Sequence, residues 1–287
     1  MAEATKIDGT LGIIAGRGPL PCAIAASASA RGVPLHIVGI RGEARDEIER
    51  FPHTWVKWGE IGKMFRALEQ NGCGDLVIIG GVDRPDFSNF RLDLGAIKTL
   101  PFILSLGKGG DDHVLSRVVR FFEEKGYRVH GAGDVAPELL AGEGPLGKKS
   151  PSAEDKTDME IAFRVVRELG RLDVGQAAVV ANGYVLAVEA AEGTDAMLAR
   201  CGGLRAAGKA GRRHPSGVMV KVPKPGQEER VDLPTIGPDT VRRAAEAGLA
   251  GIAIAASRVL MAERAATIDA ADAHGLFLVG VILEDGP

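Results

Sequence analysis

The stretch Leu11-Gly-Ile-Ile-Ala-Gly-Arg-Gly-Pro-Leu-Pro21 decides how the first half of the chain folds. Its first five residues form an apolar run, which predicts a buried strand over 11–15. A glycine turn follows, and the prolines open a helix over 20–30 because proline needs no backbone N–H in a first turn. A second apolar run predicts a strand over 35–40. This strand–turn–helix–strand unit is typical of a Rossmann-like parallel sheet.

The turn between this strand and helix is a candidate anion-binding site. Gly16 and Gly18 leave backbone N–H groups and the positive end of a helix facing a ligand. The dinucleotide fingerprint is Gly-x-Gly-x-x-Gly, and Pro21 stands at its third glycine. The broken fingerprint disfavours a Rossmann-type NAD-dependent oxidoreductase. A tight turn that binds nothing is the alternative for the same residues.

Composition and charge exclude several classes of protein. The chain has 287 residues, enough for one large or two ordinary domains, and its net charge of −3 provides no basic field for nucleic acid. The cysteines are odd in number and far apart, which argues against a disulfide framework or a zinc cluster and for a reducing compartment. The first ten residues lack an apolar signal core, and no apolar run reaches the roughly 20 residues of a membrane span. We therefore expect a cytoplasmic protein.

Strands and helices continue to alternate through the first half, which predicts an N-terminal Rossmann-like domain over 1–135. The further predicted elements are a strand over 55–58, a helix over 61–72, a strand over 75–82, a helix over 92–106, a helix that follows Gly110, and a strand over 127–131.

Two of these helices begin with charged residues that are candidates for ligand contacts. Lys63 lies in a first turn, where the helix dipole does not favour a cation, so we consider an anion contact beside the ordinary solvated lysine. Asp111 and Asp112 precede the later helix as an N-cap and a favourable first-turn charge. A metal-binding pair is the alternative for these two aspartates.

The second half differs in class from the first. Glycine, proline and lysine crowd the segment 136–152, which predicts an interdomain linker. Ser152 and Asp155 form a capping box for the next helix. The Asn-Gly pair at 182–183 lies between two apolar runs and predicts a β-hairpin. We therefore expect a C-terminal mixed-sheet α/β domain over 153–287.

The loop after the apolar run at 218–222 is the best candidate for chemistry. Pro223 and Pro225 end that strand, and Pro238 opens a helix. An α/β protein usually places its site on such a strand-to-helix loop, although a solvated loop is the alternative. The polar side chains on the loop are Lys224, Gln227, Glu228, Glu229, Arg230 and Asp232.

A second acidic segment follows the predicted hairpin. Glu189, Glu192 and Asp195 lie around the start of a helix over 195–200, for which Thr194 is a candidate cap. Such carboxylates could hold a metal ion or a hydroxyl-rich ligand. A capped helix with solvated acids is the alternative, and the spacing alone favours it.

A series of short motifs spans the chain from about Leu11 to Val281. They are Leu11-Gly-Ile-Ile-Ala-Gly16 with Gly18, Leu20 and Pro21; Trp58-Gly59; Gly62-Lys63; Arg84-Pro85; Gly110-Asp111-Asp112; Gly175-Gln176; Leu186-Ala-Val-Glu189; Glu192-Gly-Thr-Asp-Ala-Met197; and Lys224-Pro225 with Gln227, Arg230, Asp232, Pro234 and Ile236-Gly237. This set resembles the UDP-2,3-diacylglucosamine pyrophosphatase family of lipid A biosynthesis, in the cytosolic form that is unrelated to the calcineurin-like enzymes.

The chain departs from the family pattern at three places. Arg17 stands where the family has glycine, and Glu228 stands where it usually has aspartate. At 255–257 the chain has Ala-Ala-Ser instead of Glu-Ala-Gly, so the resemblance assigns no role there.

The resemblance implies that water hydrolyses the pyrophosphate of UDP-2,3-diacylglucosamine, attacking the sugar-linked phosphorus. The products are UMP and 2,3-diacylglucosamine 1-phosphate, called lipid X. It also implies a divalent cation, normally magnesium, and two domains that clasp the lipid product. A homodimer and a transient contact with the inner-membrane surface are further expectations. A nucleotide-sugar binding module without catalysis is the alternative.

The same resemblance suggests roles for individual residues. Asp232 is the expected essential carboxylate, as a magnesium ligand or as the base that orients water. Lys221, Lys224 and Arg230 are expected to bind phosphate oxygens, and Gln227 to hold the water or a phosphate oxygen. The remaining substrate-binding candidates are Gly16, Gly18, Lys63, Asp111, Asp112, Glu189 and Thr194.

Overall fold

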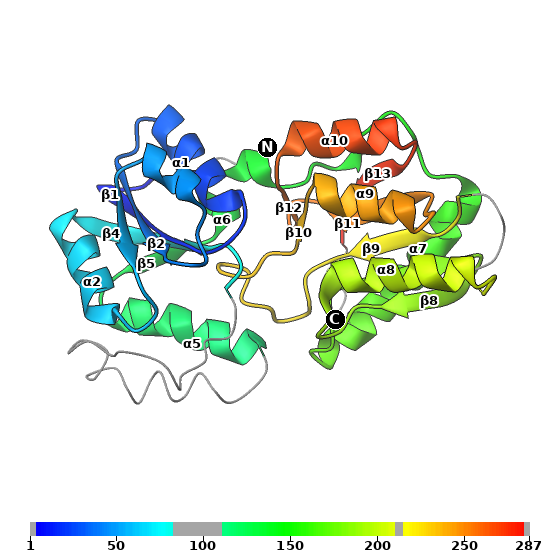
Figure 1. Cartoon of the computed structure of the whole chain (residues 1–287), viewed down its shortest axis with the longest axis horizontal. Helices are drawn as coiled ribbons and strands as arrows, with labels where there is room; N and C mark the ends of the chain where they lie inside the picture. Colours follow the sequence, from blue (N-terminus) through cyan, green and yellow to red (C-terminus); the bar gives the residue numbers. More distant parts are fainter. Residues whose placement is uncertain (1–3, 83–110, 210–214, 284–287) are drawn as a thin grey trace. The chain divides into compact units, whose positions relative to one another are not determined.

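The computed structural model describes residues 4–82, 111–209 and 215–283. The chain forms two compact units, the first built from Ala2–Pro137 with Glu228–Asp232 and the second from Glu138–Gln227 with Leu233–Pro287. Figure 1 shows the sheet and helices of each unit. This division differs from the predicted one in two ways. The segment after Pro137 belongs to the second unit, and five residues of the predicted catalytic loop belong to the first.

The first unit contains a parallel sheet with the strand order β3-β2-β1-β4-β5 over the described residues. The order reverses between β1 and β4, as it does in Rossmann-like folds. The predicted Rossmann-like parallel sheet is therefore confirmed. The strands are β1 (Thr10–Ala15), β2 (Leu35–Ile40), β3 (His53–Val56), β4 (Cys73–Ile79) and β5 (Arg128–His130).

Helices cover both faces of this sheet (Figure 1). On one face lie α1 (Leu20–Ala30) and α6 (Ala132–Val135), and on the other lie α2 (Ile61–Gln70) and α5 (Asp111–Glu124). The helix α1 has the predicted bounds, and a short 3₁₀ turn, η1 (Asp46–Arg50), follows β2. The predicted helix over 92–106 lies outside the described residues.

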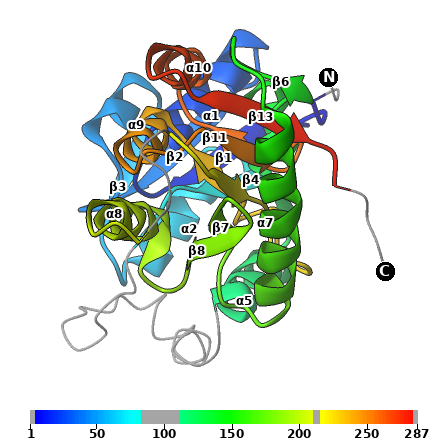
Figure 2. The ribbon, with the colours of Figure 1, turned by 90° about the vertical axis from the view of Figure 1, so that its right-hand side faces the viewer.

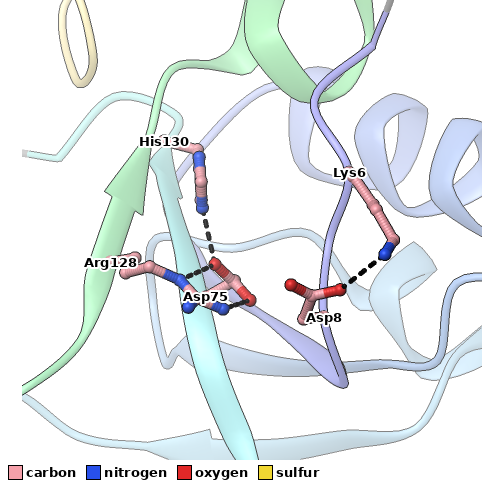
Figure 3. A network of polar contacts seen from close by, with 5 residues as sticks. All are labelled: Lys6, Asp8, Asp75, Arg128 and His130. Carbon is pink, nitrogen blue, oxygen red and sulfur yellow. Dashed lines mark hydrogen bonds and ion pairs between the residues drawn. The ribbon is translucent and has the colours of Figure 1, made fainter.

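An ion-pair network centred on the buried Asp75 joins β4 to β5 (Figure 3). Asp75 stands opposite Arg128 in the ladder, and its carboxylate accepts two hydrogen bonds of 2.7 Å from that guanidinium. His130 lies two residues further along β5, on the same face, and its Nε2 is 2.7 Å from Asp75. Asp75 is 1% exposed, so its charge depends on these partners.

Replacing Asp75 with asparagine should lower the free energy of unfolding by about 2 to 3 kcal/mol. An amide cannot accept both guanidinium bonds as an ion pair, although the exposed side of Arg128 remains solvated. Urea unfolding at pH 7 measures the change. The control is Asp8→Asn, since the Asp8–Lys6 pair in Figure 3 is exposed and should contribute under about 1 kcal/mol.

The same pair predicts a pH dependence. The Arg128 hydrogen bonds lower the pKa of Asp75, against the effect of burial, and His130 adds to the lowering. The stabilisation is therefore complete above the unfolded pKa, which is about 3.9, and is lost as pH falls towards the lower folded value. The difference between wild type and Asp75→Asn should shrink below about pH 4. A difference that stays constant down to pH 3 would contradict this account.

The second unit contains a mixed sheet with the order β6-β13-β11-β9-β7-β8 among the described strands. β9, β11 and β13 are parallel, whereas β7, β8 and β6 run antiparallel to their neighbours. This arrangement confirms the predicted mixed sheet. The strands are β6 (Gly144–Pro145), β7 (Ala177–Ala181), β8 (Tyr184–Val188), β9 (Val218–Lys221), β11 (Gly251–Ala255) and β13 (Phe277–Val281), with a separate short pair, β10 (Thr235–Ile236) and β12 (Leu260–Met261).

The helix α7 (Ala153–Arg171) packs on one face of this sheet (Figure 2). On the other face lie α8 (Gly193–Ala206), α9 (Pro238–Glu246) and α10 (Arg264–Ala273). The predicted capping box at Ser152 and Asp155 is present at the start of α7. None of the helices in the described ranges combines the length and apolar character that a membrane span requires.

The segment predicted as a linker, 136–152, is packed into the second unit. It holds η3 (Pro137–Leu139) and the edge strand β6, which pairs with β13. Ala141 is 2% exposed, and its backbone exchanges hydrogen bonds of 2.9 and 2.8 Å with Val259 and Ser257. Within this segment, Gly144 and Pro145 form the edge pairing with β13.

The predicted hairpin forms at Asn182 and Gly183, which both have positive φ, as a type I′ turn requires. The carboxylate of Asp158, on α7, holds this turn. It accepts the backbone N–H groups of Asn182 at 2.9 Å and Gly183 at 2.7 Å, and it is 5% exposed.

Asp158→Ala should lower the free energy of unfolding by about 2 kcal/mol, because two charge-assisted hydrogen bonds are lost while water can reach the exposed turn. Urea unfolding followed by circular dichroism measures the loss. Glu160→Ala, an exposed change on the same helix, should alter the stability by under about 0.5 kcal/mol. Equal effects of the two variants would contradict the role given to Asp158.

Candidate active site

The carboxyl end of β9 places a lysine inside the second unit. All four residues of β9 are buried, because the strand lies between β7 and β11 and under helices on both faces. Three of them are apolar, and the fourth, Lys221, is 7% exposed. A buried ammonium needs a polar partner, so the surroundings of Lys221 define the candidate site.

Lys221 belongs to a chain of buried hydrogen bonds. Its Nζ donates to the hydroxyl of Thr194 at 2.8 Å, and that hydroxyl donates to Oε1 of Glu189 at 2.5 Å. The other oxygen of Glu189 accepts the backbone N–H of Gln176 at 3.2 Å. Three predicted substrate-binding residues, from β9, α8 and the end of β8, therefore come together.

Thr194 does not have the predicted capping role. The helix α8 begins at Gly193, its N-cap residue is Glu192, and no side chain caps it. The hydroxyl of Thr194 is directed to Glu189 instead. The other two acids of this segment form surface ion pairs, Glu192 with Arg200 at 3.0 Å and Asp195 with Arg243 at 3.2 Å. Glu189, which is 6% exposed, is the buried member of the three.

Lys224 is paired directly with a carboxylate. Its Nζ lies 2.5 Å from Oδ1 of Asp173, just after the end of α7. Gln227 folds back on the same loop and accepts the backbone N–H of Lys224 at 2.8 Å. Lys224 and Gln227 are 9% and 7% exposed, so the predicted catalytic loop is largely buried at this end. Gly170 packs against it, because an added Cβ would lie 2.8 Å from Pro225.

Arg230 is held by two carboxylates within the first unit. Its Nε and one terminal nitrogen donate to Glu228 at 2.7 and 2.8 Å, and the other terminal nitrogen donates to Glu123 of α5 at 2.7 Å. The Arg230 hydrogen bond lowers the pKa of Glu228, against burial, and Glu228 raises the pKa of Arg230. These contacts favour an anchoring role for Arg230 over the predicted phosphate contact.

Asp232 ends the same short segment. Its backbone N–H donates to the carbonyl of Glu228 at 3.1 Å, which closes a turn, and its side chain is half-buried. Val231, between Arg230 and Asp232, packs against the apolar core of the first unit. The segment Glu228–Asp232, called the anchored segment below, therefore holds the backbone of Asp232 in the first unit. Lys221 belongs to the second unit.

The turn after β1 lies at the switch point of the first sheet. Gly16 is required by packing, because an added Cβ would lie 2.5 Å from the carbonyl of Gly81. Gly18 has a φ of +94°, and the space beside its Cα is open within 4 Å. Of these two glycines, Gly18 is the one whose positive φ and open surroundings fit the close approach of a ligand. Between them, Nε of Arg17 lies 3.5 Å from Glu43, a residue that sequence reasoning did not single out.

The remaining residues predicted to contact a ligand are Lys63, Asp111 and Asp112. Lys63 forms an exposed pair with Glu60 at 3.7 Å in the first turn of α2. The backbone of Asp111 and Asp112 begins α5, but their side chains lie outside the described residues, as do Arg84 and Pro85.

Metal-binding groups are sparse in the described part of the chain, which contains no cluster of three or more His, Cys, Asp or Glu able to hold an ion. Burial raises the pKa of Cys73 and of Cys201 to about 11, so both thiols stay protonated near neutral pH and are poor ligands. The carboxylate of Asp232 is still a suitable group for Mg²⁺, because this ion commonly binds through one or two carboxylates, water and substrate phosphates.

Two further polar residues of the site have no predicted role from the sequence. Asp173 has a φ of +54° and pairs with Lys224, and Gln176 connects to both Glu189 and Gln227. Gln176 lies in a motif that supported the family resemblance. Asp173 shows no such signal, because its contact with Lys224 joins residues 51 apart in the chain.

The fold and these contacts define a class: a two-domain α/β protein with a Rossmann-like unit and a second unit that buries a lysine–carboxylate cluster beside a central strand. Comparison with known proteins is more specific. Residues 10–139 match the family model described as the LpxI N-terminal domain, and residues 142–279 match the LpxI C-terminal domain. The protein belongs to the LpxI family.

A full-length relative supports the same assignment. The protein described as UDP-2,3-diacylglucosamine pyrophosphatase LpxI from Caulobacter vibrioides is 47% identical over 279 residues. The similarity covers 96% of this chain and 99% of the relative.

Proposed function

We propose that the protein hydrolyses the pyrophosphate of UDP-2,3-diacylglucosamine to UMP and 2,3-diacylglucosamine 1-phosphate, lipid X. The carrying observation is the near-complete coverage of the Caulobacter vibrioides pyrophosphatase, which leaves no large part of that protein unmatched. The buried lysine–hydroxyl–carboxylate cluster supports the proposal, because a pyrophosphate substrate needs fixed positive charge in a site that excludes water.

The chemistry follows from the charge of the substrate. Its pyrophosphate carries two negative charges, and more develops on the departing UMP as the bridging P–O bond breaks. A water oxygen forms the new bond to the sugar-linked phosphorus, and its proton goes to the base. Catalysis therefore depends mainly on positioning and on charge stabilisation. Lys221 is suited to the stabilising role because its ammonium is buried and held in place.

Asp232 supplies the carboxylate of this mechanism. It either accepts the proton of the attacking water or binds Mg²⁺ together with substrate oxygens. A bound divalent cation would neutralise charge on the phosphate oxygens. Gln227 orients the loop through the backbone of Lys224, and the turn at Gly18 is the site we assign to the phosphate of UMP.

Incubation of the purified protein with UDP-2,3-diacylglucosamine and Mg²⁺ tests the function. Chromatography should show UMP, and mass spectrometry should show lipid X. Lack of turnover with Mg²⁺, Mn²⁺ and Ca²⁺, despite retained binding, would favour a nucleotide-sugar binding module. In water labelled with ¹⁸O, the label should enter lipid X, and label in UMP would overturn the proposed point of attack.

Several expectations accompany the proposal. We expect dependence on Mg²⁺ or another divalent cation, a cytoplasmic location, a homodimer and a transient contact with the inner-membrane surface that presents the lipid substrate. Removal of divalent ions with EDTA should stop turnover, and added Mg²⁺ should restore it. Thermal unfolding should not respond to NAD, since the glycine fingerprint is broken at Pro21.

A further inference from the structure

We propose that Glu189 is a positioning residue, which acts through Thr194 to hold the ammonium of Lys221 against the substrate pyrophosphate. The inference rests on the proposed function, because it assigns the anion that Lys221 binds. It also changes the role expected from the sequence, where Glu189 was a candidate for direct contact with metal or sugar.

The direction of each hydrogen bond follows from the chemistry of the groups. An ionised carboxylate only accepts, so the single hydroxyl hydrogen of Thr194 is donated to Glu189 at 2.5 Å. The lone pairs of that hydroxyl then face Nζ of Lys221, which donates to them at 2.8 Å. Glu189 thus sets the orientation of Thr194, and Thr194 sets the position of the ammonium.

Glu189 is itself fixed on both sides. Its Oε1 accepts from Thr194 and its Oε2 accepts from the backbone of Gln176, while the residue is 6% exposed. Gly175 allows this arrangement, because an added Cβ there would lie 2.1 Å from the carbonyl oxygen of Glu189. A buried carboxylate engaged at both oxygens is suited to orienting its neighbours, and its charge would repel a phosphate at close contact.

The hydrogen bonds of the two lysines of the cluster differ in their acceptors. Lys224 contacts Asp173 directly at 2.5 Å, so its charge is largely compensated within the protein. Lys221 donates to the hydroxyl of Thr194, which in turn donates to Glu189, so a neutral hydroxyl takes part in orienting this ammonium.

Four variants test this arrangement by steady-state turnover of UDP-2,3-diacylglucosamine. Glu189→Gln offers one acceptor oxygen in place of two, and Thr194→Val removes the hydroxyl at nearly constant shape. Each should lower kcat/KM by about 10- to 100-fold, which is the factor expected from the loss of one hydrogen bond to a charged group. The double variant should lose no more than the worse single variant, because both changes break one chain. Thr194→Ser keeps the hydroxyl and should recover most of the loss.

Other patterns would overturn the inference. If the losses multiply in the double variant, or if Glu189→Gln is severe while Thr194→Val resembles wild type, Glu189 acts independently of Thr194. A Thr194→Ser variant as poor as Thr194→Val would show that the hydroxyl is irrelevant. Glu168→Gln, an exposed carboxylate on α7, is the matched control. If Glu189→Gln does not fold, the comparison of Thr194→Val with Thr194→Ser still tests whether the hydroxyl at position 194 positions Lys221.

Calorimetric titration with inorganic pyrophosphate separates this inference from the proposed function. Wild type and Thr194→Ser should bind pyrophosphate, whereas Thr194→Val and Lys221→Met should bind it about tenfold more weakly or worse. If wild type binds pyrophosphate in this pattern but releases no UMP, the proposed function fails and the positioning role stands. If UMP is released normally while the variants bind pyrophosphate as wild type does, the positioning role fails alone.

Discussion

Replacing Asp232 with asparagine should lower kcat for UMP release by about 100- to 10,000-fold, the range expected when a positioned acid–base group is lost. Asparagine has nearly the same shape, and the backbone of this segment is held by the turn to Glu228 and by the packing of Val231 against the core of the first unit. The fold should therefore survive, and equilibrium binding of UDP-2,3-diacylglucosamine should persist. Single-turnover measurements with Mg²⁺ present would show the loss in the chemical step.

Glu229→Gln is the matched control for this prediction. It makes the same carboxylate-to-amide change three residues away, at another half-buried position of the same anchored segment. Turnover should change little. If Glu229→Gln is as damaging as Asp232→Asn, the segment matters through its charge or its folding, and the role given to Asp232 is wrong.

Replacing Lys221 with methionine should lower kcat/KM by about 100- to 1,000-fold, as happens when one donor to a developing oxyanion is removed. Methionine preserves the apolar stem that packs within the buried end of β9, so the measured loss reports the ammonium. We expect this loss because Lys221 carries a buried charge that, in the proposed mechanism, is oriented at the pyrophosphate. Thermal unfolding of the variant should remain cooperative.

Lys224→Met provides the comparison, since both lysines are buried and lie three residues apart. The ion pair with Asp173 already compensates the charge of Lys224. Loss of the Lys224 ammonium should therefore affect turnover less, and stability more, than loss of the Lys221 ammonium. Removing it leaves Asp173 without this partner in a backbone conformation of positive φ. Equal losses of kcat/KM in the two variants would contradict the distinction between them.

The local sequence predicted most elements of the fold. The strand at 35–40 and the helix at 20–30 have their predicted bounds, because apolar periodicity and proline position act within a few residues. The hairpin at 182–183 and the capping box at Ser152 were equally local and are confirmed. The segment 136–152 was predicted as a linker, and no local pattern could predict that it also holds β6, whose pairing with β13 joins residues more than 130 positions apart.

Sequence reasoning found several residues of the candidate site but not their partners. The resemblance selected Lys221, Glu189 and Thr194 singly, and nothing in their spacing predicted that one hydroxyl would connect the lysine to the carboxylate. Asp173 was missed for the same reason. Hydrogen-bond partners are decided by which strand and helix ends the sheet order brings together, and that order depends on packing of the whole unit.

The sequence by itself determined the class of each domain, the turn at 182–183, the capping box at Ser152, and the family to which the chain belongs. These depend on backbone preferences and on motifs that each occupy a few neighbouring residues. Only the tertiary structure decided that Glu189 is buried against Thr194, that Arg230 is held by Glu228 and Glu123, and that 228–232 packs with the first unit. Those outcomes depend on burial and on contacts between distant segments, because a charge removed from water must find whichever partner the fold places beside it.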